Sequence, residues 1–461
     1  MNKKILLALP ICFLLASCAP PSDIIIDDEV EAVEEGATEI SMWMMDFEEW
    51  ENRINVGQRK AFNKNLEDGI QVKQTYIDSN NFDDLIRSAY SSHNVPDIYM
   101  VSYGNLYKEI STGRAIDLTS YFSDEIWNDL TDTATEGVKY NDKYYGFPIV
   151  MEPSTVLAYR KDLLKQYVSG FNEETDIPTK WDDLLALCKT IKTGIKSSGK
   201  KGINAFSVPT GVALAWGSWG MQYAASGGLA VTDDWSTSRV NGAGKEGYSK
   251  LASVFGELYS NGYVPLAAGN YTEASFDLCD GKSVMTTCGS WSVASIINNY
   301  PEMVENVGFA VMPTIDGNQD TVTATNGGWV YVISSECKNV EKAVEVIKFL
   351  TAEDTAQTVD YFQKAHYSKA SPRKSVQAIL DESYKKQDIV PTEWIDVINY
   401  VAERAVLEPI YDWDISVAVE GLFEEVAMDP SALNASMKKC DDAITKIIVD
   451  RGLAGKNPRL K

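Results

Sequence analysis

The residues that enzymes most often use for acid–base and nucleophilic chemistry are sparse in this 461-residue chain. Its only histidines are His93 and His366, so a Ser-His-Asp or Cys-His triad would have to use one of them. The sequence contains no Walker loop, no dinucleotide-binding glycine motif and no His-Glu-x-x-His motif. Asp316 begins a segment like a calcium loop, but Thr321 and Gly327 stand where glycine and glutamate are required. We therefore predict no metal site and no cofactor.

Paired carboxylates are the remaining route to catalysis. A glycoside hydrolase places two of them about 5–10 Å apart across a sugar. Among 66 acidic residues such pairs arise by chance, for example Glu152 with Asp414, and the sequence singles out none of them. We predict that the chain is not an enzyme, and a secreted glycoside hydrolase stays open as the alternative.

Side chains suited to holding a sugar are abundant, with 11 Trp and 23 Tyr. Aromatic rings stack on the apolar C–H faces of sugars, while carboxylates and amides bind the hydroxyls. Two junctions of glycine with tryptophan, Gly289 to Trp291 and Gly327 to Trp329, fall within one segment. Glycines allow a close approach of backbone, and the rings offer flat faces beside them. Such a segment indicates a binding cleft, although two core tryptophans would give the same pattern.

A second dense group contains Trp216, Trp219, Gln222 and Tyr223, interleaved with glycines. On a helix, Trp219 shares a face with the other three, because residues three and four apart are neighbours. A buried aromatic seam is the alternative. Two tryptophans and a glutamine so close to glycines favour a ligand site.

The elements that would position these side chains follow from hydrophobic periodicity. Strands are predicted over residues 40–45, 72–77 and 96–101, with helices over 47–65 and 82–89 between them. This β-α-β-α-β order predicts a parallel sheet covered by helices. Three short apolar runs between Gly281 and Ile333 predict further buried strands. In open α/β sheets ligands bind beyond the strand ends, where the polar and aromatic residues fall here.

The N-terminus has the pattern of a secretory signal. Lys3 and Lys4 precede an apolar run that ends in Leu15-Ala16-Ser17-Cys18. The run is shorter than the roughly 20 residues of a membrane-spanning helix. We predict a signal peptide over residues 1–17, lipid on Cys18, and an acidic tether over residues 18–38. From Ala19 to Glu39 the chain carries eight acidic residues and no basic one, which predicts disorder, and Ile24-Ile25-Ile26 is an exception to this pattern.

Composition narrows the class further. A length of 461 residues with 44% hydrophobic composition is enough for two domains. The formal net charge of −24 argues against nucleic acid and against anionic membrane surfaces as partners. The cysteines beyond Cys18 are five, an odd number with no Cys-x-x-Cys motif. Buried free thiols are favoured, and a Cys279–Cys288 bridge stays open.

Three motifs occur in the order in which one family carries them: Pro96-Asp97-Ile98, then Tyr159-Arg160-Lys161-Asp162-Leu163, then Pro178-Thr179-Lys180-Trp181. In this order the chain resembles the extracellular solute-binding proteins (family 1, maltose-binding-protein-like), the carbohydrate-binding lipoproteins of bacterial ABC importers. The resemblance implies an α/β, two-lobe periplasmic-binding-protein-like fold (type II). Each lobe would be a mainly parallel sheet flanked by helices, and a hinge of crossing strands would join them. Lobe 1 would comprise residues 38–149 and 330–370, and lobe 2 residues 150–329 and 371–461.

The resemblance also implies which residues touch the ligand. It places Trp43 and Asp46 at the end of the first strand, Glu152 at the first crossing, and Trp413 where relatives have a stacking aromatic. The substrate-binding candidates are Trp43, Asp46, Tyr103, Glu152, Trp216, Trp219, Gln222, Trp291, Trp329 and Trp413.

The implied function is extracellular capture of a carbohydrate by closure of the two lobes and its delivery to the permease subunits of an ABC importer. The many aromatics favour a neutral oligosaccharide. The protein would be a monomer, lipid-anchored through Cys18 at the extracellular face of the cell membrane, with no nucleic-acid partner. A surface sugar sensor or adhesin, and a peptide or amino-acid ligand, stay open.

Overall fold

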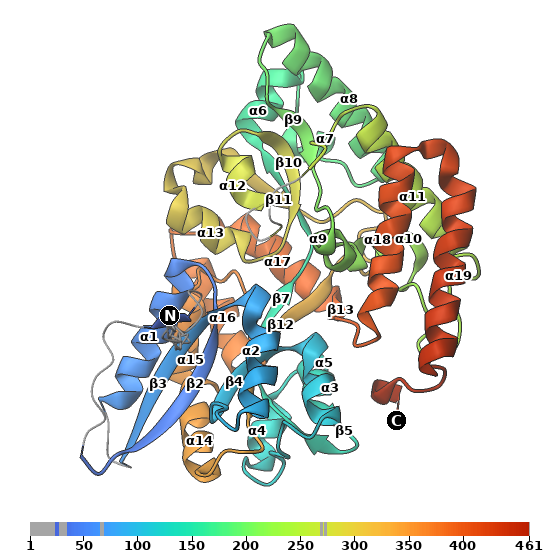
Figure 1. The fold of residues 1–461 in the computed structure, drawn as a ribbon. Helices are drawn as coiled ribbons and strands as arrows, with labels where there is room; N and C mark the ends of the chain where they lie inside the picture. The colour runs from blue at the N-terminus through green and yellow to red at the C-terminus, as the bar shows by residue number, and fades with distance from the viewer. Residues whose placement is uncertain (1–23, 27–34, 65–68, 268–270, 272–273, 461) are drawn as a thin grey trace, which may run out of the picture.

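The computed structural model describes residues 24–26, 35–64, 69–267, 271 and 274–460. The chain forms two lobes, one drawn in blue, cyan and orange and the other in green, yellow and red (Figure 1). The predicted signal peptide and Cys18 lie outside the described residues. Within the described part, no helix has the length and apolar character that a membrane crossing requires.

The first lobe is built on the larger sheet, whose strand order is β1-β3-β2-β4-β12-β13 with β7 also paired to β12. Strand β2 is parallel to both β3 and β4, which confirms the predicted β-α-β-α-β unit. The strands are β1 (Ile24–Ile26), β2 (Thr38–Asp46), β3 (Ile70–Asp78), β4 (Ile98–Ser102), β7 (Phe147–Pro153), β12 (Thr325–Ile333) and β13 (Val406–Leu407). The helices up to β7 are α1 (Glu49–Asn63), α2 (Ser79–Ser91), α3 (Tyr103–Ser111), α4 (Asp124–Asp129) and α5 (Asp132–Val138).

Strand β1 corrects part of the predicted tether. Ile24 pairs with Ile77 and Ile26 with Thr75, so this run forms an antiparallel edge strand on β3. Three consecutive β-branched residues favour extended backbone strongly enough to pair inside an otherwise acidic segment. These three residues, the exception to the predicted disorder, therefore form a strand within the predicted tether.

The second lobe is built on a four-stranded sheet in the order β11-β8-β10-β9. Its strands are β8 (Val156–Arg160), β9 (Asn204–Ser207), β10 (Ser283–Cys288) and β11 (Val307–Ala310). Its helices are α6 (Lys161–Tyr167), α7 (Glu173–Asp176), α8 (Trp181–Ser198), α9 (Val212–Gly217), α10 (Trp219–Ser226), α11 (Lys245–Ser260), α12 (Ala274–Cys279), α13 (Ser292–Asn299), α18 (Trp413–Met428) and α19 (Leu433–Arg451). Figure 1 shows α18 and α19 side by side at the outer edge of this lobe.

The mixed direction of both sheets corrects one detail of the predicted fold. Strand β8 is antiparallel to β10 and to β11, and β12 is antiparallel to β4 and to β7. Strands that cross between lobes lie directly beside strands that return, and such antiparallel neighbours need no helical crossover. The two-lobe α/β fold is confirmed, but its sheets are mixed rather than mainly parallel.

Packing in the last third of the chain differs from the predicted lobe limits. Helices α14 (Val340–Ile347), α15 (Thr355–Lys364), α16 (Lys374–Ser383) and α17 (Thr392–Arg404) contribute buried side chains to the first hydrophobic core. Arg373 is held in the first lobe, where its Nε donates to Asp129 over 2.9 Å. In the last third of the chain, side chains of the second core begin only at Tyr411. The limits remain a prediction, because α17 also packs on the second lobe, where the Trp394 ring centroid lies 5.0 Å from that of Phe309 in β11.

The five cysteines of the body are free thiols. Four of them are buried, as predicted, and Cys337 is half-buried. Burial raises the pKa of both Cys279 and Cys288 to about 12. Cys279 and Cys288 are therefore two separate thiols and form no bridge.

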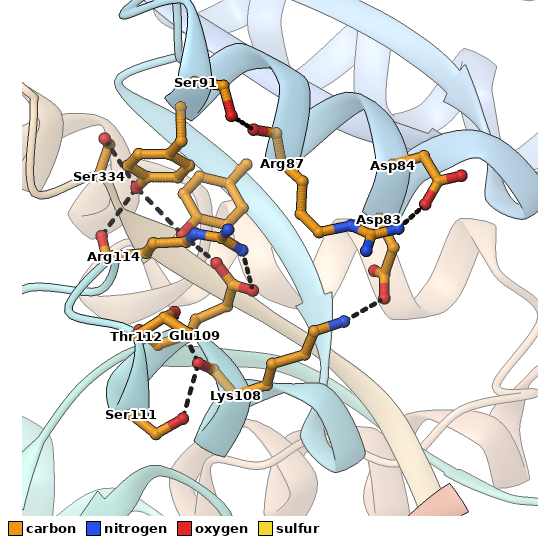
Figure 2. Close-up of polar contacts among 12 residues, drawn as sticks. Asp83, Asp84, Arg87, Ser91, Lys108, Glu109, Ser111, Thr112, Arg114 and Ser334 are labelled. Atoms are coloured by element: carbon orange, nitrogen blue, oxygen red, sulfur yellow. Dashed lines mark hydrogen bonds and ion pairs between the residues drawn. The ribbon is translucent and has the colours of Figure 1, made fainter.

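A polar network between α2 and α3 ties the first lobe together (Figure 2). The Lys108 ammonium lies 3.0 Å from Asp83, and the Arg114 guanidinium lies 3.5 Å from Glu109. The Tyr99 hydroxyl donates to Glu109 over 2.9 Å. Burial raises the pKa of Glu109, while Tyr99 and Arg114 oppose that rise. We call Glu109, Tyr99 and Arg114 the Glu109 network.

Candidate functional site

The ends of three strands bring candidate residues together at one edge of the larger sheet. Strands β2 and β4 run parallel and end at Asp46 and Ser102, and Tyr103 follows as the first residue of α3. Strand β12 runs the other way, and Trp329 pairs with Ser102. The start of β12 therefore lies beside the end of β4, facing the second lobe, as expected for a site beyond strand ends.

Glu408 lies at the centre of this edge, and sequence reasoning missed it. Its Oε1 accepts a hydrogen bond from Trp216 Nε1 over 3.0 Å. A Cβ on Gly327 would lie 2.3 Å from Oε1, and a Cβ on Gly104 would lie 3.2 Å from Oε2. A side chain at position 327 would displace the carboxylate from this place, and one at position 104 would crowd it. We call Glu408, Trp216, Tyr103, Gly104 and Gly327 the Glu408 cluster.

Burial controls the charge of the Glu408 cluster. It raises the pKa of Glu408 to about 7, and the Glu152 carboxylate contributes to that rise. The hydrogen bonds from Trp216 and the Gly104 amide, and the charge of Arg459, oppose the rise. Tyr103 is fully buried, and burial followed by the nearby Glu152 and Glu408 raises its pKa. Among the described residues the Tyr103 hydroxyl has no hydrogen-bond partner. A ligand hydroxyl would accept a hydrogen bond from this donor and would donate one to the neighbouring carboxyl group.

Five aromatic rings of the second lobe form a connected row. Trp216 has its ring centroid 5.9 Å from Trp291, 5.5 Å from Tyr271 and 6.4 Å from Trp219. Trp219 lies 6.1 Å from Trp413, which is 41% exposed. We call Trp216, Trp219, Tyr271, Trp291 and Trp413 the aromatic row. Four of these were predicted, and Tyr271 was missed because nothing in its local sequence marks it.

Of the two glycine junctions, the one at Gly328 shows the predicted close approach of backbone, whereas at Gly289 the close neighbour is a ring. A Cβ on Gly289 would fall 2.0 Å from the Trp291 ring, and a Cβ on Gly328 would fall 2.2 Å from the Val150 carbonyl oxygen. Gly328 also has a φ of +128°, a backbone conformation that residues with a side chain rarely adopt. Trp329 next to it packs on Phe47, with ring centroids 5.0 Å apart.

Glu152 is bound inside the protein. Its Oε1 lies 2.8 Å from the ammonium of Lys369, which also contacts Glu51 at 2.5 Å. Burial raises the pKa of Glu152, while the Lys369 charge and a hydrogen bond from Trp329 oppose that rise. We call Lys369, Glu51 and Glu152 the Lys369 centre. It joins α1, β7 and the chain after α15. Glu152 therefore holds these elements together rather than contacting a ligand.

Gln222 lies elsewhere. It is fully buried, its Nε2 donates to Ser218 over 3.0 Å, and its Oε1 accepts from Tyr248 over 2.8 Å. Both ends of the amide are therefore used within the core of the second lobe. We remove Gln222 from the candidate site.

Trp43 and Asp46 remain at the end of β2, both half-buried. The Asp46 carboxylate accepts a hydrogen bond from Asn52 over 2.6 Å, which fixes the turn into α1. The next turn carries Glu48, which reaches the second lobe by accepting hydrogen bonds from Ser295 and, over 2.8 Å, from Asn299. Burial raises the pKa of Glu48. These contacts link the two lobes.

Neither a metal centre nor a histidine site stands out in the described residues. No group of three or more His, Cys, Asp or Glu is placed to hold a metal there. His93 is exposed and lies 3.0 Å from Glu336. Burial lowers the pKa of His366.

Comparison with known proteins places this geometry in a family. Residues 58–392, more than half of the chain, match the family described as bacterial extracellular solute-binding protein. A relative in Deinococcus radiodurans, named probable ABC transporter-binding protein, is 22% identical over 271 residues, covering 53% of this chain and 61% of that protein. The match thus spans less than two thirds of that relative's own length.

Two solved structures share the fold. One is an ABC transporter solute-binding protein from Thermotoga lettingae bound with α-D-tagatose, with a TM-score of 0.73 at 18% identity. The match covers 89% of this chain and 100% of the Thermotoga chain. The other is the cyclic α-maltosyl-1,6-maltose binding protein from Arthrobacter globiformis, with a TM-score of 0.70 at 17% identity, covering 90% and 100%.

Proposed function

Because the chain belongs to the family of bacterial extracellular solute-binding proteins, we propose that it captures a carbohydrate between its lobes and delivers it to the permease of an ABC importer. The protein acts by binding and returns its ligand unchanged. Similar folds bound with tagatose, or named for a cyclic maltosyl sugar, support the choice of ligand class.

The observation that carries the proposal is the aromatic row lying against the Glu408 cluster. Trp216 belongs to both, since its ring packs in the row while its Nε1 binds Glu408. Rings that take the apolar faces of a sugar, beside a carboxyl group and a phenol that take its hydroxyls, are what sugar recognition requires. Trp413 is 41% exposed and Trp216 and Trp291 are half-buried, which leaves ring surface for a ligand.

The charges of the site favour a neutral sugar. Glu408, Glu152 and Glu51 lie within it or beside it, and the Lys369 ammonium is already shared between the last two. A uronate or phosphate would be repelled by these carboxylates, and among the described residues named here no cation is left to pair with it. A neutral oligosaccharide meets no such repulsion, and the length of the aromatic row suits more than one ring.

Ligand capture would act through hinge closure. The crossing at Ser154 is fixed to β12, where Ser154 N donates to the Thr325 carbonyl over 2.8 Å and the two hydroxyls lie 2.9 Å apart. A sugar that touches the aromatic row and Tyr103 at once would contact both lobes, and so would stabilise the closed arrangement. The contacts of Glu48 with Ser295 and Asn299 would form part of that closed state.

The remaining predictions complete this proposal. Lipid on Cys18 would hold a monomeric protein at the extracellular face of the membrane, and residues beyond it would let the lobes reach the permease.

A binding panel tests the proposal. Thermal unfolding of the full chain would be recorded with oligosaccharides of increasing length, and with amino acids and peptides as controls. A ligand at about 100 times its Kd adds about 2.7 kcal/mol of stability, which is readily measured. We expect stabilisation by one glycan series, with the sugar recovered intact. Recovery of cut sugar would establish the glycoside hydrolase, and a panel without any effect would reject the carbohydrate assignment.

A further inference from the structure

The second lobe carries a local positive charge within a strongly acidic chain. No aspartate or glutamate occurs between Asp183 and Asp233, although the chain contains 66 acidic residues. Five lysines fall in the same stretch, all of them exposed: Lys189, Lys192, Lys196, Lys200 and Lys201. The formal net charge of the chain is −24, so this stretch differs in sign from the molecule as a whole. A negatively charged partner would be attracted here and repelled by the average surface.

The geometry of α8 arranges these lysines in one row. Lys189, Lys192 and Lys196 are three and four residues apart, so they share one face of the helix. Another face of α8 is buried in the second hydrophobic core, which fixes the orientation of the helix. The helix ends at Gly199, and the turn that follows carries the other two lysines. We call the five lysines the lysine patch.

Carboxylates do not neutralise the lysine patch. Among the described residues none of its members forms an ion pair. The Lys192 ammonium donates to the Gly262 carbonyl over 3.2 Å and lies 5.8 Å from the Tyr263 ring centroid, and both partners are neutral. Burial raises the pKa of Tyr263, and Glu257 on α11 adds to the rise, so one carboxylate borders the patch. One carboxylate beside five ammonium groups leaves a clear excess of positive charge.

Helix stability does not account for the row. Like charges three and four residues apart on a helix repel each other and destabilise it. The helix dipole favours a cation in the last turn, which applies to Lys196. Lys189 lies about two turns earlier, where this effect has faded. Its charge therefore has no stabilising role within α8, whereas attraction to an anionic partner would give it one.

The lysine patch lies at the end of the second lobe away from the proposed sugar site. Strand β10 ends at Cys288, directly before Gly289 and Trp291. Strand β9 runs parallel to β10, and its first residue Asn204 pairs with Ser283 at the start of β10. The chain enters β9 from α8 at this opposite end, and Figure 1 shows α8 at the end of the second lobe away from the first lobe. An occupant of the patch therefore does not cover the sugar site.

We propose that the lysine patch is a docking surface for an anionic membrane, which it binds through the phosphate groups of the lipids. Lysines on flexible stems suit the diffuse charge of a lipid surface, and about four to eight of them on an amphipathic helix are typical of such contacts. A protein partner fits less well. Protein interfaces are depleted of lysine and gain affinity from tryptophan, tyrosine and arginine, none of which occurs between Lys189 and Lys201.

The net charge of the chain does not prevent this contact. Charges more than about 10 Å away are largely screened at about 0.1 M salt, so the lysines that touch the surface decide the interaction. With lipid on Cys18, the patch would supply a second membrane contact and would set the orientation of the protein. The proposal does not rest on the carbohydrate assignment.

Sedimentation with lipid vesicles tests this surface. The chain from residue 18 onward contains every described residue, and Cys18→Ser keeps it free of lipid. It is mixed with vesicles of phosphatidylglycerol or of phosphatidylcholine at about 0.1 M salt. We expect binding to the anionic vesicles alone, and its loss at about 1 M salt, where the screening length is about 3 Å. Lys189→Gln with Lys196→Gln should lower the partition coefficient about twentyfold, since each lysine near an anionic surface contributes about fivefold.

A matched pair of substitutions on α19 controls for the loss of charge. Lys438→Gln with Lys446→Gln removes two exposed lysines from the same lobe, each ion-paired with an aspartate, and should leave vesicle binding unchanged. The proposal is rejected if neither kind of vesicle binds, if both kinds bind equally, or if the two double variants have the same effect. Binding of poly-L-glutamate without binding of vesicles would assign the patch to an acidic protein and would also overturn the proposal.

Discussion

Two buried glutamates, Glu109 on α3 and Glu408 directly after β13, both have a raised pKa but differ in the hydrogen bonds and charges that surround them. Glu109 receives the Tyr99 hydroxyl and faces Arg114, and the Tyr90 hydroxyl donates in turn to the Arg114 carbonyl over 2.8 Å (Figure 2). The groups in this network bind one another inside one lobe. Nothing in it is left for a ligand.

Glu408 has no such complete set of partners. Trp216 and the Gly104 amide bind it, but among the described residues no cation forms an ion pair with its carboxylate, and the buried Tyr103 hydroxyl beside it has no hydrogen-bond partner. The contributors also come from both lobes. A raised pKa alone therefore does not mark a functional site, whereas a raised pKa beside an unmatched donor and open aromatic rings does.

The largest expected difference between the two glutamates is in the pH dependence of stability. Burial holds a proton on Glu408 in the folded state up to about pH 7, against an ordinary pKa of 4.5 in the unfolded chain. Its contribution is therefore full below pH 4.5 and is lost as the pH rises to about 7, by up to about 3 kcal/mol. Denaturant unfolding of the wild type and Glu408→Gln across this range should show a shallower decline in the variant. Equal slopes would contradict the pKa assigned to Glu408.

Removal of Trp216 should have the largest effect on the ligand. Trp216→Ala takes away a ring of the aromatic row and the donor to Glu408, and a central aromatic of this kind is worth about 2 kcal/mol, or about thirtyfold in affinity. Trp127→Phe is the control, because Trp127 stacks on Tyr144 within the first lobe, with ring centroids 3.9 Å apart. It should lower the thermal midpoint and leave sugar affinity unchanged. Equal losses of affinity in both variants would mean that general destabilisation is being measured.

Substitution of the two glutamates by glutamine should separate binding from stability. Glu408→Gln should weaken sugar binding about tenfold, because a carboxyl group that accepts from sugar hydroxyls is replaced. Glu109→Gln should cost about 1–3 kcal/mol of unfolding free energy through its unmatched partners, with sugar affinity unchanged. Calorimetric titration and thermal unfolding of both variants check this pair. The reverse pattern would overturn the comparison.

The smallest expected effect is at the contact between the lobes. Asn299→Ala removes the 2.8 Å hydrogen bond to Glu48, and one such bond contributes about 0.5–1.5 kcal/mol. Sugar affinity should fall about threefold if this bond forms only on closure. Small-angle scattering with and without sugar should still show compaction. Unchanged affinity would remove Glu48 from the closing mechanism.

Local sequence predicted the parts of the molecule that local physics controls. The periodicity of the first hundred residues predicted β2, α1, β3, α2 and β4, and the second glycine–tryptophan junction predicted the close backbone approach that the structure shows at Gly328. The prediction of mainly parallel sheets was wrong, because the antiparallel pairing of β8 and β12 depends on partners far away in the chain.

The candidate site was less predictable, since it depends on tertiary neighbours. Gln222 was taken as a ligand contact, but its acceptor is used by Tyr248, a partner that no helical spacing reveals. Lys369 was missed, although it accounts for the role of Glu152. Glu408 carried one readable signal, a lone acid in the apolar run Ala405-Val406-Leu407-Glu408-Pro409-Ile410. An isolated charge within such a run indicates a buried and therefore perturbed carboxyl group.

A crystal structure of the protein with the oligosaccharide that stabilises it most tests the central claim directly. We expect sugar rings against Trp216 and Trp291, a sugar hydroxyl within hydrogen-bond distance of Glu408 or Tyr103, and the two lobes closed around them. A sugar bound away from the aromatic row, with the contact between Trp216 and Glu408 undisturbed, would contradict the account.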